Sequence, residues 1–426
     1  MSEWATVTLA DIADIRFSNV DKKSLTGEKS VRLCNYMDAY SNNYITADIP
    51  FMEATATAPE MERFKVEKGD NIITKDSETP DDIGIPAVVI DDIPNLICGY
   101  HLALIKPKRD KVDPIYLSKQ LGSKQSAIYF SRLANGSTRY GLSSSAIASI
   151  KIPLASFVEQ RQIAEVLSTL DKAIEKTESL IAKYQQIKAG LMHDLFTRGV
   201  TADGKLRPPR KQAPELYQET PIGWIPKEWD TATTGDVCTS IVPGRNKPAL
   251  DGGALPWITI TDLSGTRITE SRAGLSVSAT ALRIAAGRAV PAGSVIMSCV
   301  GSFGIVAIAG CELVINQQLH AFVANERICP EWLMHSLRHQ YSFMERIATQ
   351  TTIKYINKAG CESIPVAIPP IEEQQIIVGR IGSIENIVNS ESQIALKLRF
   401  QKLGLMHDLL TGKVRVKFAD SQKELA

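Results

Sequence analysis

Side chains that suit contact with nucleic acid gather in a few short segments of this chain. The segment Val242–Pro248 combines a turn with Arg, Asn and Lys, which bind phosphates and the edges of guanine and adenine. Solvated charge is the ordinary role of such loops, but several of them recur at matching places in the chain. The candidate DNA contacts are Lys75, Ser77, Arg132, Arg139, Tyr140, Arg245, Asn246, Lys247, Ser302, Thr351, Lys354 and Tyr355.

The motifs of catalytic classes are missing from the sequence. It contains no G-x-x-x-x-G-K-[ST] loop for a nucleoside triphosphate and no G-x-G-x-x-G turn for a dinucleotide. It also lacks the Asn-Pro-Pro-Tyr or Asp-Pro-Pro-Tyr motif with which amino-methylating enzymes hold a flipped base. His335 and His339 have the spacing of a metal pair, but without a third ligand we expect solvent-exposed histidines. We therefore predict a non-catalytic chain with no metal and no cofactor of its own.

The part of the chain that is expected to position these loops contains an internal repeat. Gly190–Leu195 recurs identically as Gly404–Leu409, and Glu159–Gln160 recurs as Glu373–Gln374, both at an offset of 214 residues. The segment between these matches therefore aligns without a gap. Looser matches precede it: Lys68–Thr74 corresponds to Ala292–Ser298, and Ser137–Leu142 corresponds to Thr351–Ile356. Each half is predicted to be one globular domain followed by one helix.

The two helices are predicted from apolar residues that recur every three or four positions. About 40 residues at a rise of 1.5 Å give a helix on the order of 60 Å, which needs a partner. We expect the two helices to pack as an antiparallel coiled coil about a pseudo-two-fold axis, against the alternative of two unrelated core helices. The predicted seam comprises Ile163, Leu167, Leu170, Ile174, Ile181, Tyr184, Leu191, Ile377, Ile381, Ile384, Val388, Leu398 and Leu405.

The expected fold class is α/β, with two globular mixed-sheet domains separated by the two long helices. A Pro-rich linker divides the halves. The predicted order is a first domain at 1–152, a first helix at 153–199, the linker at 200–226, a second domain at 227–367, a second helix at 368–412 and a C-terminal tail at 413–426.

Composition limits the kinds of partner. The 426 residues are 44% hydrophobic and 22% charged, as in ordinary globular proteins, and the net charge of +1 provides no global field for holding nucleic acid. DNA contact must then come from local patches or from a partner. Seven Cys residues without a C-x-x-C pair indicate reduced thiols, and the amino terminus does not resemble a secretory signal, so we expect a cytoplasmic protein.

The layout resembles the specificity subunit of type I restriction-modification systems. Ile-Pro-Leu at 152–154 leads to the first Glu-Gln pair and Ile-Pro-Pro at 368–370 to the second, while Gly244–Pro248 with Pro256–Ile258 resembles the opening of that family's target recognition domains, as does Val31–Leu33 with Asp38. The resemblance implies that each globular domain reads one half of a bipartite double-stranded DNA target. It also implies that the helices set the spacing and dock two modification subunits.

The resemblance assigns the chemistry to partner subunits. The modification subunits would bind S-adenosylmethionine and methylate adenine, and restriction subunits, when present, would cut DNA with ATP and Mg. Residues 1–150 carry a charge balance of −3 against +2 for residues 201–365, so we expect the first half to rely more on its partner's positive surface and on Arg132 and Arg139. The alternative function is a protein-assembly scaffold that does not read DNA, and a chain that is itself a methyltransferase or nuclease is disfavoured by the missing motifs.

Overall fold

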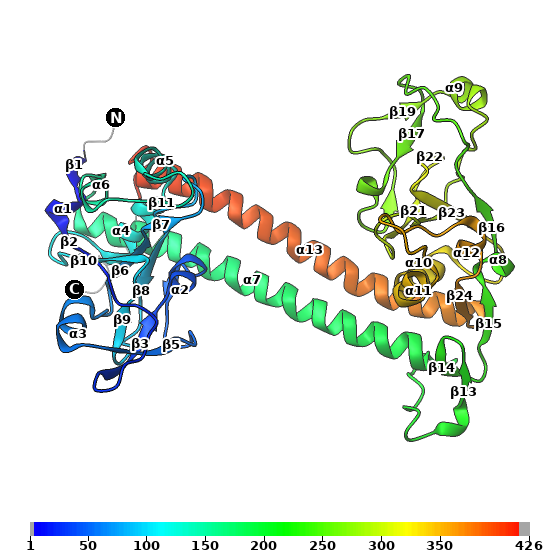
Figure 1. The fold of residues 1–426 in the computed structure, drawn as a ribbon, viewed down its shortest axis with the longest axis horizontal. Coiled ribbons are helices and arrows are strands. Elements are labelled where there is room, and N and C mark those ends of the chain that lie inside the picture. Colours follow the sequence, from blue (N-terminus) through cyan, green and yellow to red (C-terminus); the bar gives the residue numbers. More distant parts are fainter. Residues whose placement is uncertain (1–3, 417–426) are drawn as a thin grey trace, which may run out of the picture. The chain divides into compact units, whose positions relative to one another are not determined.

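The computed structural model describes residues 4–416, and the chain divides into two compact units. Unit 1 contains the residues up to Leu180 and those from Glu391 onward, and unit 2 is Ile181–Ser390. Each unit therefore holds one sheet domain and part of each long helix (Figure 1). The predicted tail at 413–426 lies mostly outside the described residues. Within residues 4–416, no helix is both long and apolar enough to cross a membrane.

The described part of unit 1 is built on a five-stranded sheet in the order β2-β10-β6-β8-β4 and a three-stranded sheet in the order β5-β3-β9. Two further pairs are β1-β12 and β11-β7. The strands are β1 (Ala5–Thr8), β2 (Ala13–Phe17), β3 (Lys29–Cys34), β4 (Tyr44–Ile45), β5 (Met52–Ala56), β6 (Asn71–Thr74), β7 (Asp76–Ser77), β8 (Pro86–Val89), β9 (Leu96–Cys98), β10 (Leu102–Pro107), β11 (Tyr140–Gly141) and β12 (Lys151–Leu154). The short helices are α1 (Leu9–Ile12), α2 (Tyr36–Tyr40), α3 (Ala58–Phe64), α4 (Pro114–Leu121), α5 (Lys124–Leu133) and α6 (Ser144–Ala148).

Unit 2 repeats this plan, with sheets in the order β16-β23-β20-β21-β18 and β19-β17-β22, the pair β15-β24 and an additional hairpin β13-β14. Its strands are β13 (Tyr217–Thr220), β14 (Gly223–Pro226), β15 (Asp230–Thr233), β16 (Cys238–Ile241), β17 (Leu255–Ile258), β18 (Arg267–Ile268), β19 (Ser276–Val277), β20 (Val295–Ser298), β21 (Val306–Ala309), β22 (Val314–Ile315), β23 (Leu319–Ala324) and β24 (Pro365–Ile368). Its short helices are η1 (Pro214–Leu216), α8 (Thr234–Val237), η2 (Ile260–Asp262), α9 (Ala279–Ile284), α10 (Pro330–His339), α11 (Tyr341–Ile347) and α12 (Lys358–Glu362).

The two sheet domains match strand by strand. β2, β10, β6, β8 and β4 occupy the places of β16, β23, β20, β21 and β18, with the same parallel pairing at the β4 and β18 edges. The central strands β6 and β20 are buried along their whole length, as expected of strands covered on both faces. The predicted mixed-sheet α/β architecture with an internal repeat is confirmed.

The long helices are α7 (Phe157–Arg198) and α13 (Ile371–Leu410). In unit 1, Leu409 and Leu410 at the end of α13 share a core with Ile163 and Leu167 near the start of α7, so the two segments run antiparallel. Unit 2 shows the reciprocal packing, with Leu195 of α7 against Ile377 and Ile381 of α13. All the predicted seam residues are buried or half-buried.

The helices begin a few residues later than expected. Residues 153 and 154 belong to β12, where Pro153 pairs with Thr6 of β1, and α7 begins after Ser156, whose Oγ accepts a hydrogen bond from the Glu159 N–H at 3.3 Å. Residues 153 and 154 are extended because β12, the last strand of the domain, pairs with β1, its first strand.

A Glu-Gln pair anchors the first turn of each long helix. The Gln160 side chain accepts from the Asp113 N–H at 2.8 Å and donates to the carbonyls of Lys111 at 3.2 Å and Ala155 at 2.9 Å. Gln374 accepts from the Cys329 N–H at 2.9 Å. It also donates to two carbonyls, those of residue 327 at 2.9 Å and residue 369 at 2.8 Å. Each amide thus joins a helix start to the turn before α4 or α10.

The neighbouring glutamates hold the segments that follow the other helix. Glu373 on α13 accepts from Arg207, which follows α7, with Nη1 to Oε1 at 2.6 Å, and also from the Val200 N–H at 2.7 Å. Glu159 on α7 accepts from Arg415, which follows α13, at 2.6 Å. Each carboxylate therefore fixes the chain where it leaves the partner helix.

An ion pair joins the two helices in each unit. In unit 1, Lys402 Nζ lies 2.6 Å from Asp171 Oδ1, and in unit 2, Lys188 Nζ lies 2.6 Å from Glu385 Oε1. Both pairs obey the 214-residue offset. Asp171 also accepts from Lys119 of α4. Burial by itself would raise the pKa of Asp171, but the two ammonium groups outweigh it and hold that pKa below the ordinary value of 3.8.

We expect Gln374→Ala to destabilise unit 2. The substitution leaves the Cys329 N–H and two carbonyls without partners, which costs about 1–3 kcal/mol for an unsatisfied buried group. Hydrogen exchange of the α10 amides measures the loss. Gln375→Ala, at the exposed next position, is the matched control and leaves exchange unchanged. Equal effects of the two variants would contradict the anchoring role.

We expect Asp171→Asn to lower the free energy of unfolding of unit 1 by about 3–5 kcal/mol at pH 7, because Lys119 stays buried without its carboxylate. The lowered Asp171 pKa stabilises the fold above pH 3.8, and this contribution is lost as the pH falls through that pKa. The difference between wild type and variant should then shrink at acid pH, as measured by exchange of the α4 amides.

Glu178→Gln is the matched control for that variant. Its carboxylate pairs with Arg399 across the same two helices, but the two side chains are 43% and 60% exposed. Exposed pairs contribute within about 1 kcal/mol, so its pH profile should follow the wild type. A pH-independent gap between Asp171→Asn and wild type would contradict the ion-pair explanation.

Candidate nucleic-acid interface

The loops with candidate contacts leave the five-stranded sheet of each unit at the same end of its strands. This end of the sheet, with the loops that leave it, is called the candidate edge. In unit 2, β16 ends where Ile241 pairs with Ala321, and β20 ends where Ser298 pairs with Leu319. Both partners lie at the start of β23, so the segments after β16 and after β20 emerge side by side. In unit 1, Phe17 pairs with Ala103 and Thr74 with Leu102, which places the segments after β2 and β6 equivalently.

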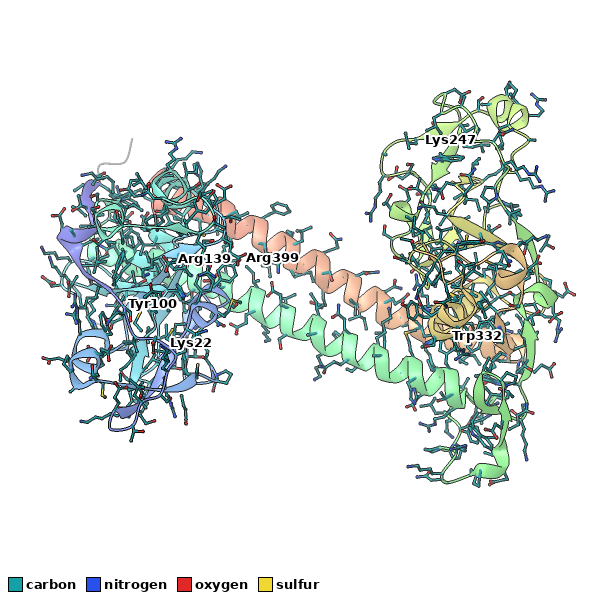
Figure 2. The ribbon with its side chains drawn as sticks, in the orientation of Figure 1. Lys22, Tyr100, Arg139, Lys247, Trp332 and Arg399 are labelled. Atoms are coloured by element: carbon teal, nitrogen blue, oxygen red, sulfur yellow. The ribbon has the colours of Figure 1, made fainter. Side chains whose placement is uncertain are left out.

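Arg245, Asn246 and Lys247 lie in the loop between β16 and β17, and all three are exposed (Figure 2 labels Lys247). The Gln317 amide donates to the Gly244 carbonyl at 3.2 Å. This bond attaches the loop to the residues that precede β23. The loop therefore presents two cations and an amide, and its backbone is fixed by this hydrogen bond.

The other candidates of unit 2 meet at the same edge. Val300 forms a β-bridge with Tyr355, and the Gly301 N–H donates to the Lys354 carbonyl at 2.8 Å, which brings Ser302 near both residues. Ser302, Thr351 and Tyr355 are exposed. The Lys354 ammonium donates to Glu345 at 2.6 Å, and this hydrogen bond raises the pKa of Lys354. Lys354 is thus a cation that is already partly neutralised.

In unit 1, the strands β7 and β11 bring two candidate segments together. Ser77 pairs directly with Tyr140, and Arg139 precedes it in an exposed loop (Figure 2). Arg132 is exposed on the last turn of α5, just before Asn135, which is bridged to Gly141. Arg132, Arg139, Tyr140 and Ser77 therefore belong to one region, although they are far apart in sequence.

Lys75 differs from the exposed cation that the sequence suggested. Its side chain is only 11% exposed, its ammonium lies 2.8 Å from Asp76 Oδ2, and it sits 4.8 Å from the centre of the Tyr100 ring. The chain buries Lys75 because it directly follows β6, the central strand. Lys75 therefore lies beneath the exposed residues of the candidate edge and supports them, and it is not placed as a surface contact.

The sequence prediction did not include Tyr100, His101 or Lys22. Tyr100 and His101 immediately precede β10, and Tyr100 is 51% exposed. A cavity of about 120 Å³ lies beside them, lined by Val20, Asp21, Lys22, Asn35, Tyr36, Tyr100 and His101. For Tyr100 and His101, the signal that could have found them is their place one or two residues before a buried strand that is repeated in the second half.

The expectation of solvent-exposed histidines is confirmed for His339 and wrong for His335. His335 is 2% exposed, and burial lowers its pKa to about 4, so it is neutral at physiological pH. His339 is exposed, and its ring lies 4.7 Å from that of Phe196. Both lie on α10, a helix that packs against β20 and β21, and for His335 a surface position was inferred from residue type alone. Among residues 4–416, no group of three or more His, Cys, Asp or Glu side chains is placed to hold a metal ion.

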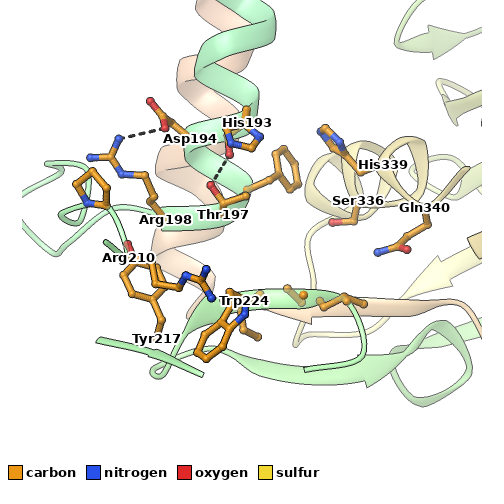
Figure 3. A pocket seen from close by; sticks show the side chains of 16 residues that line it. His193, Asp194, Thr197, Arg198, Arg210, Tyr217, Trp224, Ser336, His339 and Gln340 are labelled. Atoms are coloured by element: carbon orange, nitrogen blue, oxygen red, sulfur yellow. Dashed lines mark hydrogen bonds and ion pairs between the residues drawn. The ribbon is translucent and has the colours of Figure 1, made fainter. Parts of the chain in front are cut away.

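A separate pocket of about 650 Å³ lies in unit 2 between the end of α7, the β13-β14 hairpin and α10 (Figure 3). Arg198 pairs with Asp194 on its wall at 3.1 Å, and the Arg210 guanidinium lies 4.3 Å from the centre of the Trp224 ring. Both arginines that line it are thus already paired with other lining residues. It holds none of the candidate DNA contacts.

Comparison with known proteins identifies relatives over almost the whole chain. The family described as "Type I restriction modification DNA specificity domain" matches residues 1–184 and 226–399. A Methanocaldococcus jannaschii protein assigned as the type I restriction enzyme MjaX specificity subunit is 26% identical over 333 residues, which cover 76% of this chain and 73% of that protein. The HindI specificity subunit of Haemophilus influenzae is 20% identical over 467 residues, with 96% and 98% coverage.

The fold is shared with a solved structure. The crystal structure of the type I restriction-modification system S subunit from M. genitalium matches with a TM-score of 0.60 and 14% sequence identity. The match covers 98% of this chain and 97% of that chain. At this identity the likeness concerns the fold.

Proposed function

The chain belongs to the family of type I restriction-modification DNA specificity proteins, and we propose that it is the DNA-recognition subunit of such a complex. Each sheet domain reads one half of a bipartite target in double-stranded DNA. The observation that carries this proposal is the edge repeated in both units, where loops from matching places in the fold present Arg, Lys, Asn and Tyr side chains.

The two units carry different side chains at equivalent backbone positions, which fits a target with two different halves. Arg139 and Tyr140 stand in unit 1 where Ile353 and Lys354 stand in unit 2. Base edges in the major groove are distinguished by which donors and acceptors face them, so two such edges would select different base sequences. The unspecified gap between the half-sites is set by α7 and α13.

The helices also supply the docking sites for modification subunits in this proposal. Their ends repeat each other, with one Glu-Gln pair and one interhelical ion pair in each unit. Two equivalent ends fit two copies of one partner. Those partners bind S-adenosylmethionine and methylate adenine, and restriction subunits supply the ATP- and Mg-dependent cleavage. The chain itself is then non-catalytic and works in the cytoplasm, where its DNA is.

Substituting the loop cations tests DNA contact in the second domain. We expect Arg245→Ala with Lys247→Ala to abolish retention of the specific duplex and to leave assembly with the modification subunit intact. If both cations bind phosphates, the slope of log K against log salt should fall by about 1 for each phosphate that is no longer neutralised. Lys211→Ala with Lys227→Ala removes the same charge from exposed positions on either side of the β13-β14 hairpin and is the matched control.

Adenine-methylation mapping tests the function as a whole. Genomes of cells with and without this gene, expressed together with a modification subunit, are compared. We expect one split motif with a fixed gap to disappear when the gene is absent. If methylation is unchanged while the modification subunit is active, the chain does not read DNA, and the protein-assembly scaffold becomes the better explanation.

A further inference from the structure

The candidate edges of the two units share the same main-chain hydrogen bonds. In unit 1, the Lys75 N–H donates to the His101 carbonyl at 3.1 Å and the Leu142 N–H donates to the Lys75 carbonyl at 2.9 Å. In unit 2, Cys299 makes both bonds at 2.9 Å, with the Gln318 carbonyl and with the N–H of residue 356. Lys75 therefore corresponds to Cys299, and His101 corresponds to Gln318.

The side chains on this common framework are different. In unit 1, one oxygen of Asp76 accepts from Lys75 at 2.8 Å and from His101 Nδ1 at 2.9 Å. The Lys75 ammonium in turn lies over the Tyr100 ring, and the Tyr100 and His101 rings meet edge to face at 4.7 Å. These four side chains form the Tyr-His cluster.

In unit 2, the corresponding side chains carry no charge. Cys299 and Val300 replace the ion pair, and Gln317 and Gln318 replace the two rings. Both glutamines are exposed. Gln317 holds the Gly244 loop, and the side-chain oxygen of Gln318 accepts from the Asn316 amide at 3.0 Å, which orients the Gln318 amide group.

The Tyr-His cluster holds its hydrogen-bonding atoms in one orientation, as a side chain that distinguishes between bases must. Because Nδ1 of His101 is bonded to Asp76, the ring cannot rotate freely and Nε2 is the nitrogen available to a ligand. The His101 side chain is 41% exposed, whereas Lys75 beneath it is nearly buried. Discrimination between bases requires donors and acceptors held in one geometry by supporting residues, and the cluster supplies both.

We propose that Tyr100 with His101 in the first domain, and Gln318 at the corresponding position of the second, are base-reading residues. Lys75 and Asp76 are positioning residues that fix His101. This inference rests on the proposed DNA-recognition function and adds which side chains distinguish the half-sites. The ligand is double-stranded DNA, and these side chains contact the edges of its bases and not only its phosphates.

Methylation mapping and competition binding with the full chain and its modification subunits test the inference. Tyr100→Gln with His101→Gln should relax or change the preferred base in the first half-site. A direct base contact corresponds to roughly 5- to 100-fold discrimination, so a loss of that size is expected at the affected position. The second half-site should be unchanged. Gln318→Ala should give the reciprocal result.

Glu53→Gln with Glu62→Gln is the matched control, because it also introduces two glutamines in unit 1, at exposed positions of β5 and α3 that lie outside the candidate contacts and outside the long helices. Its preferred bases should equal those of the wild type. A uniform loss of affinity across all sequences for Tyr100→Gln with His101→Gln, or no change at any base position, would overturn the inference. A wild-type complex that produces no split motif would instead refute the proposed function itself, so the two failures are distinguishable.

A pair of Asp76 variants tests positioning. Asp76→Ala removes the acceptor for His101 Nδ1 and should relax the same base position as the His101 substitution. Asp76→Asn keeps an oxygen acceptor and should restore most of the preference. If both variants retained wild-type base preference while losing stability, the role of Asp76 would be structural only.

Discussion

The anchoring of each helix start by a buried Glu-Gln pair is the constraint on which the rest of the structure depends. One amide satisfies an N–H and two carbonyls that the domain cannot satisfy by itself, and the adjacent carboxylate binds an arginine from the segment that follows the other helix. Buried polar groups are costly unless all of their partners are present. The sheet domain, the start of one helix and the end of the other are therefore fixed together within each unit.

This arrangement separates the rigid part of each unit from the variable part. The anchors sit at the turns before α4 and α10, whereas most candidate contacts sit after β6, β16 and β20 or just before β10 and β23. Side chains at the strand ends can differ without disturbing the anchors, because their backbone is held by main-chain hydrogen bonds. Cys299 makes the same backbone bonds as Lys75 although the two side chains share no chemistry.

Charge at the candidate edges is modulated by internal pairing. Lys75 is neutralised by Asp76, and Lys354 is paired with Glu345, while Arg139, Arg245 and Lys247 remain exposed. The net charge of +1 and the negative balance of the first domain agree with contact through a few placed groups. Recognition of this kind relies on geometry more than on a broad positive field.

The amino-acid sequence alone was enough to establish the repeat, the two long helices, the family and the lack of catalytic motifs, because these are local or periodic properties of the chain. It also located Arg245, Lys247 and Arg139, since exposed turns are visible in composition. Tertiary packing was needed to establish that Lys75 is buried, that His335 is neutral and enclosed, and that Tyr100 and His101 lie beside Asp76. The first and the last of these facts depend on the pairing of β10 with β6 and of β11 with β7, and the burial of His335 depends on the packing of α10 against β20 and β21. These elements are separated in the sequence, and no local pattern encodes which distant side chains their packing brings together.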